Sequence, residues 1–157
     1  MTHRERSTTG TKRGNMTSTD PKAVVRKNTE EVQSHGNWAL FDELFANNFV
    51  DHTPQPGIPA TKSGVLSLYQ GLRAAFPDFH AMIEWQSAEG DLVTTYKVYH
   101  GTHKGTLFGI PATGREVNFE TVDAMRVKDG KITDHWGVAN LYSLFQQLSG
   151  ADGPALA

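Results

Sequence analysis

The sequence of 157 residues contains no cysteine. A disulfide framework, a thiolate nucleophile and a cysteine-bound metal are therefore excluded. The sequence also has no apolar run that approaches the roughly 18–20 residues of a transmembrane helix, and its N-terminus lacks the apolar stretch of a signal peptide. From these absences we expect a cytoplasmic protein with no membrane partner.

An excess of charge of one sign is missing as well. The 15 lysine and arginine residues nearly balance the 17 aspartate and glutamate residues, and the formal net charge is -2 at pH 7. Nucleic acids and anionic membranes attract strongly basic surfaces. We therefore expect neither of them as a partner.

Motifs of several common enzyme classes are absent. There is no Gly-x-Ser-x-Gly nucleophile elbow, and Gly105, Gly109 and Gly114 do not have the spacing of a phosphate-binding loop. The 7 histidines raise the question of a metal, but no His-Glu-x-x-His pair is present, and His100 and His103 lie on either side of a turn. We therefore expect no metal site.

The length predicts one domain with a sizeable core. Residues 1–18 are polar and rich in threonine, so we predict a disordered N-terminal extension there. The predicted domain covers residues 19–150, and residues 151–157 are expected to form a disordered tail.

Three helices are predicted in the first half of the domain. Asp20 is a typical N-cap and Pro21 suits the first helical position, so a helix begins there. Asn37 caps a second helix. A third helix ends before Pro77, because the residue before a proline disfavours the α conformation. Its buried stripe has helical spacing and consists of Val65, Leu68, Tyr69, Leu72 and Phe76.

Residues 117–138 contain the strongest turn signal, an Asp-Gly pair between two alternating runs. A two-residue turn sets the register, so that Met125 would face Asp134 and Asp123 would face Trp136. Alternation then predicts that both aspartates lie on the apolar face of this hairpin, about 7–8 Å apart at Cα. The other members of that face would be Val117, Phe119, Thr121, Met125, Val127, Ile132, Trp136 and Val138.

A second hairpin is predicted from Phe79 to Gly101, with a turn at Glu89-Gly90. If this turn also has two residues, Tyr96 shares a face with the apolar side chains of the preceding strand. That face would comprise Phe79, Ala81, Ile83, Trp85, Thr94, Val98 and His100. Helices followed by an antiparallel meander argue for an α+β fold, with helices packed on one face of a curved sheet.

Five segments carry a resemblance to a known family: FVDHTP at 49–54, AFPDF at 75–79, GTHKGTLFGIPATGREV at 101–117, DGKITDHW at 129–136 and LFQQL at 144–148. In this order they resemble the SnoaL-like polyketide cyclases, also called ester cyclases, of the nuclear-transport-factor-2-like superfamily. The resemblance implies a cone-shaped α+β fold, in which a curved antiparallel sheet is wrapped by N-terminal helices around an apolar cavity.

The activity that this resemblance implies is an intramolecular aldol condensation, which closes a ring on a polyketide ester without a cofactor. The implied partners are a small apolar substrate that contains a carbonyl group and a second copy of the chain, bound through the exposed sheet face. The superfamily also contains isomerases, dehydratases and non-catalytic members. Isomerisation, dehydration and a non-catalytic binding or assembly module therefore stay open.

The resemblance assigns the general acid/base to Asp134, within the acid-His-Trp motif of the family, and places His52 and His103 in the pocket as further catalytic candidates. A neutral imidazole there would orient the acid or hydrogen-bond a substrate carbonyl, and the alternative is a histidine that only packs in the core. An apolar face favours this role for Asp134, because apolar walls raise the pKa of a carboxyl toward neutrality. The alternative is a structural carboxylate that pairs with an arginine or a hydroxyl. Many relatives carry Asp at the position of Asn140, so no second acid is expected there.

Asp123 is either a second acid, coupled to Asp134, or a hydrogen-bond partner of a helix residue. Four further side chains are expected to line the cavity and contact the substrate, with ordinary packing as the alternative for the tyrosine. They are Phe119, Trp136, Tyr96 and His100.

Overall fold

The computed structural model describes residues 19–150, so the predicted N-terminal extension (1–18) and tail (151–157) lie outside the described residues. None of the helices within the described range combines the length and hydropathy needed to cross a bilayer. The elements follow in the order α1 (Pro21–Lys27), the π-helical η1 (Asn28–Gln33), α2 (Trp38–Leu44), β1 (Phe45–Asp51), α3 (Lys62–Ala75), β2 (His80–Glu89), β3 (Leu92–Thr102), β4 (Glu116–Lys128), β5 (Lys131–Ala139) and α4 (Leu141–Ser149).

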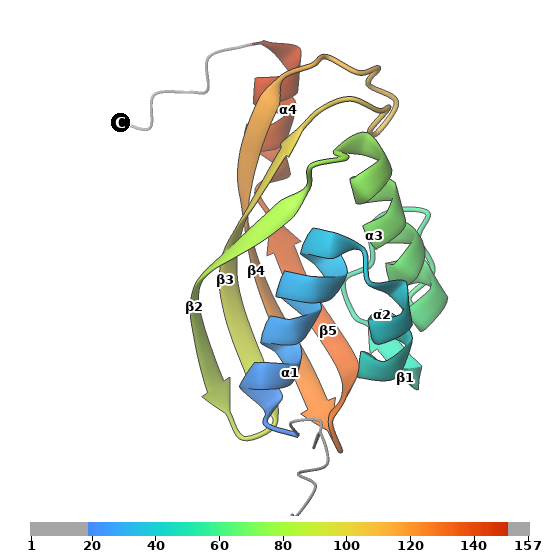
Figure 1. The fold of residues 1–157 in the computed structure, drawn as a ribbon, viewed down its shortest axis with the longest axis vertical. Coiled ribbons are helices and arrows are strands. Elements are labelled where there is room, and N and C mark those ends of the chain that lie inside the picture. Colours follow the sequence, from blue (N-terminus) through green and yellow to red (C-terminus); the bar gives the residue numbers. More distant parts are fainter. Residues whose placement is uncertain (1–18, 151–157) are drawn as a thin grey trace, which may run out of the picture.

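One curved sheet of five strands organises the fold (Figure 1). Its order is β1-β5-β4-β3-β2, and all neighbouring strands are antiparallel except β1 and β5, which are parallel. The helices α1, α2 and α3 cover one face of this sheet, while α4 packs against β4 (Figure 1). The predicted α+β architecture, with N-terminal helices around a curved sheet, is confirmed.

Two of the predicted helix starts are confirmed by their caps. The side chain of Asp20 accepts a hydrogen bond from the backbone N–H of Ala23 at 3.3 Å, and Pro21 follows it at the first helical position. The side chain of Asn37 accepts from the N–H of Leu40 at 3.1 Å. The first predicted helix continues beyond α1 as the wider turn η1, which apolar spacing does not predict.

The apolar core lies between the helices and the sheet in two clusters. The first joins α1, α2 and α3 to the middle of the sheet and includes Val24, Val25, Phe41, Phe45, Phe49, Tyr69, Met125 and Ile132. The second lies toward α4 and includes Phe76, Phe79, Tyr99, Phe119, Leu144 and Leu148. Both clusters supply walls of the cavity described below.

The hairpin of β4 and β5 begins as predicted. Asp129 and Gly130 have φ values of 52° and 74°, as a type I′ turn requires, and Val127 pairs with Ile132. Beyond this pair the register shifts by one residue, because Thr133 is an extra residue of β5 with no partner in β4. Such a β-bulge reverses the alternation of side chains for the rest of the strand.

The bulge decides which residues of β5 face the helices. Arg126 pairs with Asp134, and Met125 pairs with His135. His135 therefore shares the inner face of β4, whereas Asp134 and Trp136 lie on the outer face of the sheet. Val138, which pairs with Val122, lies on the outer face as well. The prediction that Asp134, Trp136 and Val138 belong to the apolar face is wrong, because it assumes a hairpin without a bulge.

A second bulge, at Glu84, has the same effect between β2 and β3. The turn lies at Gly90-Asp91, one residue later than predicted, so that Glu89 pairs with Leu92. Beyond the bulge, Ile83 pairs with Lys97 rather than with Tyr96. Tyr96 and His100 consequently lie on the outer face, and the prediction that they line the cavity is wrong. The buried, inward-facing residues of β3 are Val93, Thr95, Lys97, Tyr99 and Gly101.

Gly101 provides a test of the packing between α3 and β3. A Cβ at this position would lie 2.7 Å from the Cβ of Phe76, so we expect Gly101→Ala to lower the free energy of unfolding in urea by about 1–3 kcal/mol. The matched control is Gly71→Ala within α3, where a Cβ meets nothing within 4 Å. This control should stabilise the protein by about 0.5–1 kcal/mol, and equal effects of the two changes would contradict the packing.

Candidate active site

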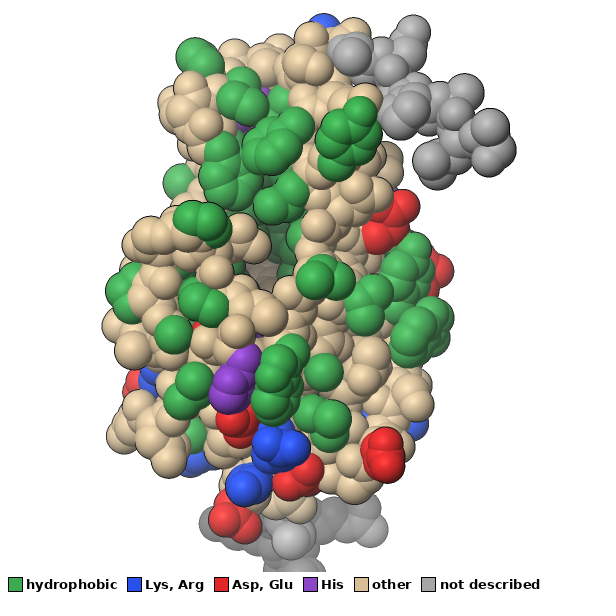
Figure 2. All heavy atoms as spheres, turned by 180° about the vertical axis from the view of Figure 1, so that it is seen from behind, with side chains coloured by type: hydrophobic (Ala, Val, Ile, Leu, Met, Phe, Trp, Pro, Cys, Tyr) green, Lys and Arg blue, Asp and Glu red, His purple; other side chains and the backbone are tan. Residues whose placement is uncertain are grey.

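A cavity lies between the helices and the inner face of the sheet, and it offers about 90 Å³ to the centres of water-sized molecules. One water needs about 10–15 Å³ on this measure, so the space takes several waters or a small organic group. Figure 2 shows the hollow from behind, bordered by hydrophobic side chains. Its apolar and aromatic walls include Phe45, Phe49, Leu68, Leu72, Phe108, Phe119, Met125, Leu141 and Leu144.

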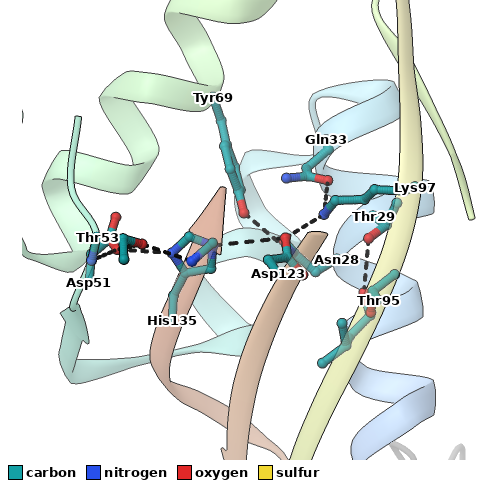
Figure 3. A network of polar contacts seen from close by, with 12 residues as sticks. Asn28, Thr29, Gln33, Asp51, Thr53, Tyr69, Thr95, Lys97, Asp123 and His135 are labelled. Carbon is teal, nitrogen blue, oxygen red and sulfur yellow. Dashed lines mark hydrogen bonds and ion pairs between the residues drawn. The ribbon is translucent and has the colours of Figure 1, made fainter. Parts of the chain in front are cut away.

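Four charged side chains from four strands meet beside this cavity (Figure 3). The Nζ atom of Lys97 lies 2.8 Å from Oδ2 of Asp123. The Nδ1 atom of His135 lies 2.9 Å from Oδ1 of Asp51, and its Nε2 atom lies 3.8 Å from Oδ2 of Asp123. The last distance is too long for a hydrogen bond but short enough for strong attraction between charges.

Burial makes these pairings obligatory. Lys97 is 0% exposed, Asp123 3% and Asp51 4%. A charge that is removed from water is tolerated only with a partner of opposite charge and with hydrogen bonds. The lysine and the histidine supply that compensation for the two carboxylates.

Polar neighbours hold the charged network in place. The side-chain oxygen of Gln33 accepts a hydrogen bond from Lys97 at 3.2 Å, and its nitrogen donates to the hydroxyl of Tyr99 at 3.3 Å. The backbone N–H of Thr53 donates to Asp51 at 3.0 Å. Gln33 ends the π-helical η1, whose buried residues also include Asn28 and Thr29. This wide turn therefore presents polar groups to the sheet, and π turns recur at functional sites.

The network shifts the pKa values of its members. Burial disfavours the imidazolium of His135, but its contacts with Asp123 and Asp51 outweigh burial and raise the pKa of His135 to about 9. Burial also acts against the ionised carboxylates, yet Lys97 and His135 hold the pKa of Asp123 below its usual value, and His135 and Thr53 lower the pKa of Asp51. At neutral pH the network contains two cations and two anions.

Gly137 keeps the space in front of His135 and Asp123 open. It is the next inward residue of β5, directly opposite Asp123. A Cβ on Gly137 would lie 2.8 Å from Nε2 of His135 and 3.1 Å from the Cβ of Asp123. A side chain there would push the imidazole away from the carboxylate, so glycine suits a close approach of this kind.

Asp134 does not line this cavity. Its carboxylate contacts Nε2 of His52 at 3.0 Å, accepts a hydrogen bond from the hydroxyl of Thr133 at 2.7 Å and lies 3.9 Å from Arg126. Burial acts to raise the pKa of Asp134, but these partners outweigh it and lower the pKa. The prediction of an apolar site with a raised pKa is wrong, and the arrangement is that of a structural carboxylate.

The remaining outer-face residues surround Asp134 or lie farther along the sheet. The rings of His52 and Trp136 stack with their centroids 4.4 Å apart. Tyr96 and His100 stack on rings of β2. None of these four residues is among the cavity walls.

His103, Asp123 and Phe119 have different positions. His103 is the first residue of the loop after β3 and is fully buried. Its Nδ1 accepts a hydrogen bond from the backbone N–H of Thr113 at 3.2 Å, and it does not line the cavity. Asp123 and Phe119 line the cavity, as predicted. The partners of Asp123 are the strand residues Lys97 and His135 rather than a helix residue.

Sequence reasoning missed Lys97, Asp51 and His135. The available signal for Lys97 is its inward position in an alternating strand, where a lysine indicates a buried ion pair. Asp51 and His135 are direct neighbours of the predicted residues His52 and Asp134. Successive side chains of a strand point to opposite faces of the sheet, so an error of one position places a residue on the wrong face.

Within residues 19–150, no group of three or more histidine, aspartate or glutamate side chains has an arrangement that could hold a metal ion. The expectations of no metal and no cofactor stay predictions.

Comparison with known proteins identifies relatives of the chain. A family model described as SnoaL-like polyketide cyclase matches residues 23–148. Nogalonic acid methyl ester cyclase of Streptomyces nogalater is 34% identical over 97 residues, which cover 61% of this chain and 72% of the relative. Aklanonic acid methyl ester cyclase DnrD of Streptomyces peucetius is 30% identical over 100 residues, which cover 63% of this chain and 67% of the relative.

Solved structures give the same picture. IdmH of Streptomyces antibioticus, described as a candidate polyketide cyclase, superimposes with a TM-score of 0.74 at 31% sequence identity, over 83% of this chain and 99% of that chain. A SnoaL-like protein of Jannaschia sp. CCS1 superimposes with a TM-score of 0.74 over 96% of this chain, and at 19% identity it supports the fold alone.

The raised pKa of His135 predicts a stability that depends on pH. A group whose pKa rises on folding stabilises the fold fully below its unfolded pKa of 6.5, and this contribution is lost as the pH rises through about 9. The shift corresponds to about 3 kcal/mol. We expect the free energy of unfolding in urea to fall by up to this amount between about pH 6 and about pH 10, and His135→Gln should show little of that fall.

The control for this measurement is His80→Gln, because His80 is exposed on the outer face and takes no part in the network. It should keep the pH dependence of the unchanged protein. A His135→Gln protein with that same dependence would show that another group is responsible.

Proposed function

The chain belongs to the SnoaL-like polyketide cyclase family, and we propose that it closes a ring on a carbonyl compound of polyketide type by acid/base catalysis without a cofactor. The observation that carries this proposal is the pair of His135 and Asp123, an imidazolium and a carboxylate at the wall of an apolar cavity. Two relatives have the names of ester cyclases, which supports the reaction class.

An aldol ring closure needs one proton acceptor and one proton donor. A proton leaves the nucleophilic half of the substrate, a carbon–carbon bond forms to a carbonyl carbon, and the carbonyl oxygen becomes a hydroxyl by taking up a proton. All atoms of the substrate are retained in the product, so the product is an isomer of the substrate and no oxidant or reductant is required. Isomerisation and dehydration need the same two proton transfers.

The opposite pKa shifts assign the two roles. His135 holds its proton up to a pH of about 9, so it is the donor to the carbonyl oxygen. Asp123 is ionised at neutral pH, so it is the acceptor. Separated pKa values of two neighbouring groups are typical of acid/base pairs in enzymes. After ring closure, the proton on Asp123 can return to His135 across the short gap between them.

The first substrates to test are nogalonic acid methyl ester and aklanonic acid methyl ester, after which the two relatives are named. We expect His135→Gln and Asp123→Asn to lower the rate of ring closure by about 100-fold or more, since general acid/base groups contribute on that order. The matched control is Asp134→Asn, which changes an aspartate outside the cavity and should leave the rate nearly unchanged. The product is measured by chromatography and mass spectrometry as an isomer of equal mass.

The same experiment separates the alternatives. For the active protein, kcat/KM should fall as the pH rises through about 9, where His135 loses its proton. A larger loss in Asp134→Asn than in His135→Gln would overturn the assignment. Binding of the esters without ring closure would instead favour a non-catalytic binding module, and circular dichroism checks that each variant is folded.

We also propose that a second copy of the chain covers the outer face of the sheet, as the family resemblance implies. Supporting this, large apolar side chains are exposed there: Met82 is 53% exposed, Trp85 49% and Val138 72%. Met82 and Trp85 belong to β2, and Val138 belongs to β5. Exposed apolar side chains on both the β2 and the β5 side of this face suit an identical partner related by two-fold symmetry.

Light scattering after size-exclusion chromatography tests this dimer. Trp85→Glu should shift the chain from dimer to monomer, because a carboxylate in an apolar interface is strongly unfavourable. Gln70→Glu is the matched control, since Gln70 is exposed on α3 on the opposite side of the sheet. A monomeric unchanged protein would contradict the proposal directly.

A further inference from the structure

Two buried oxygen atoms on the inner face of β4 have no hydrogen-bond partner within the described part of the chain. They are Oδ1 of Asp123 and Oγ1 of Thr121. Both residues line the cavity, and they are 3% and 7% exposed. Because they are two positions apart on one strand, their side chains point to the same side. A buried oxygen without a partner is unfavourable, so a ligand that satisfies both atoms is favoured.

The chemistry of Asp123 decides which ligand group fits. Its other oxygen, Oδ2, is held by Lys97 at 2.8 Å, so the carboxylate is fixed in place with Oδ1 left over (Figure 3). An ionised carboxylate only accepts hydrogen bonds, whereas the hydroxyl of Thr121 both donates and accepts. The ligand atom that faces Oδ1 must therefore be a donor. A ketone or ether oxygen in that position would place two hydrogen-bond acceptors against each other, with no hydrogen atom between them.

The surroundings exclude a cationic donor. Lys97 and His135 already lie on either side of Asp123 and carry positive charge, so an ammonium group would be repelled. The nearby walls are aromatic, which favours a flat, apolar ligand. These walls include Phe45, Phe49, Tyr69, Tyr99 and Phe119.

We infer that Asp123 and Thr121 form a hydroxyl-binding subsite, and that the ligands of this cavity are phenols and enols rather than their ethers or simple ketones. The inference rests on the proposed function, because it names the substrate class for that site. A 1,3-dicarbonyl compound reaches the subsite as its enol, with the enol hydroxyl donating to Oδ1 of Asp123.

This binding mode agrees with the proposed ring closure. As the enol carbon forms its bond to the carbonyl carbon, the enol oxygen becomes a carbonyl oxygen and its proton passes to Asp123. The attacked carbonyl oxygen takes a proton from His135. One carbon–carbon bond forms, two protons move, and no co-reactant is needed.

The test compares 1-naphthol with 1-methoxynaphthalene, which differ by a methyl group on the donor oxygen. Binding to the full chain is measured by titration calorimetry. We expect 1-naphthol to bind at least about tenfold more tightly, because a site built for a hydroxyl rejects analogues that lack it. Thr121→Val should weaken the binding of 1-naphthol several-fold without changing the affinity for the ether. The matched control is Thr94→Val, on the outer face of β3, which should change neither affinity.

The inference is overturned if the ether binds as tightly as 1-naphthol, or if Thr121→Val and Thr94→Val behave alike. His135→Gln separates this result from the fate of the proposed function. It should keep the preference for 1-naphthol while losing ring closure. If His135→Gln keeps both the preference for 1-naphthol over the ether and full ring-closing activity, the proposed mechanism is contradicted and the hydroxyl subsite is not. If His135→Gln has no activity and 1-naphthol is not preferred over the ether, the hydroxyl subsite is contradicted and the proposed mechanism is not.

Discussion

A fully buried ion pair between two central strands is the interaction on which the site depends. Lys97 of β3 and Asp123 of β4 lie 2.8 Å apart with almost no exposure to solvent. Loss of either partner would leave an uncompensated buried charge, which costs about 3–5 kcal/mol. Lys97 orients the carboxylate of Asp123 and occupies one of its two oxygens. The negative charge of Asp123 in turn helps to keep His135 protonated.

The network around this pair joins segments that are far apart in the chain. Asp51 comes from β1 and His135 from β5, while Gln33 reaches the lysine from η1. Parallel pairing of β1 with β5 brings Asp51 and His135 opposite each other. Polar chemistry is thereby concentrated at one wall of a cavity whose other walls are apolar, and in such surroundings charges interact strongly.

Two β-bulges decide which face each side chain occupies. Up to Thr133 the β4–β5 hairpin follows the register that its turn imposes; beyond Thr133 the inner residue is His135 instead of Asp134. Glu84 has the same role in β2, and it leaves Tyr96 outside. Asp123 and Phe119 could be placed correctly because β4 is regular and its alternation is unbroken. Asp134, Trp136, Tyr96 and His100 could not, since nothing local in β5 or in β2 indicates that the strand contains an extra residue.

The amino-acid sequence by itself determined the helix starts, the type I′ turn, the α+β class and the membership in a family, because caps, turn residues and periodicity act over a few neighbouring positions. Only the tertiary structure decided which acid meets which base. Register beyond a bulge, the pairing of β1 with β5 and the burial of Lys97 depend on residues distant in sequence, and a shift of one position exchanges the two faces of a strand.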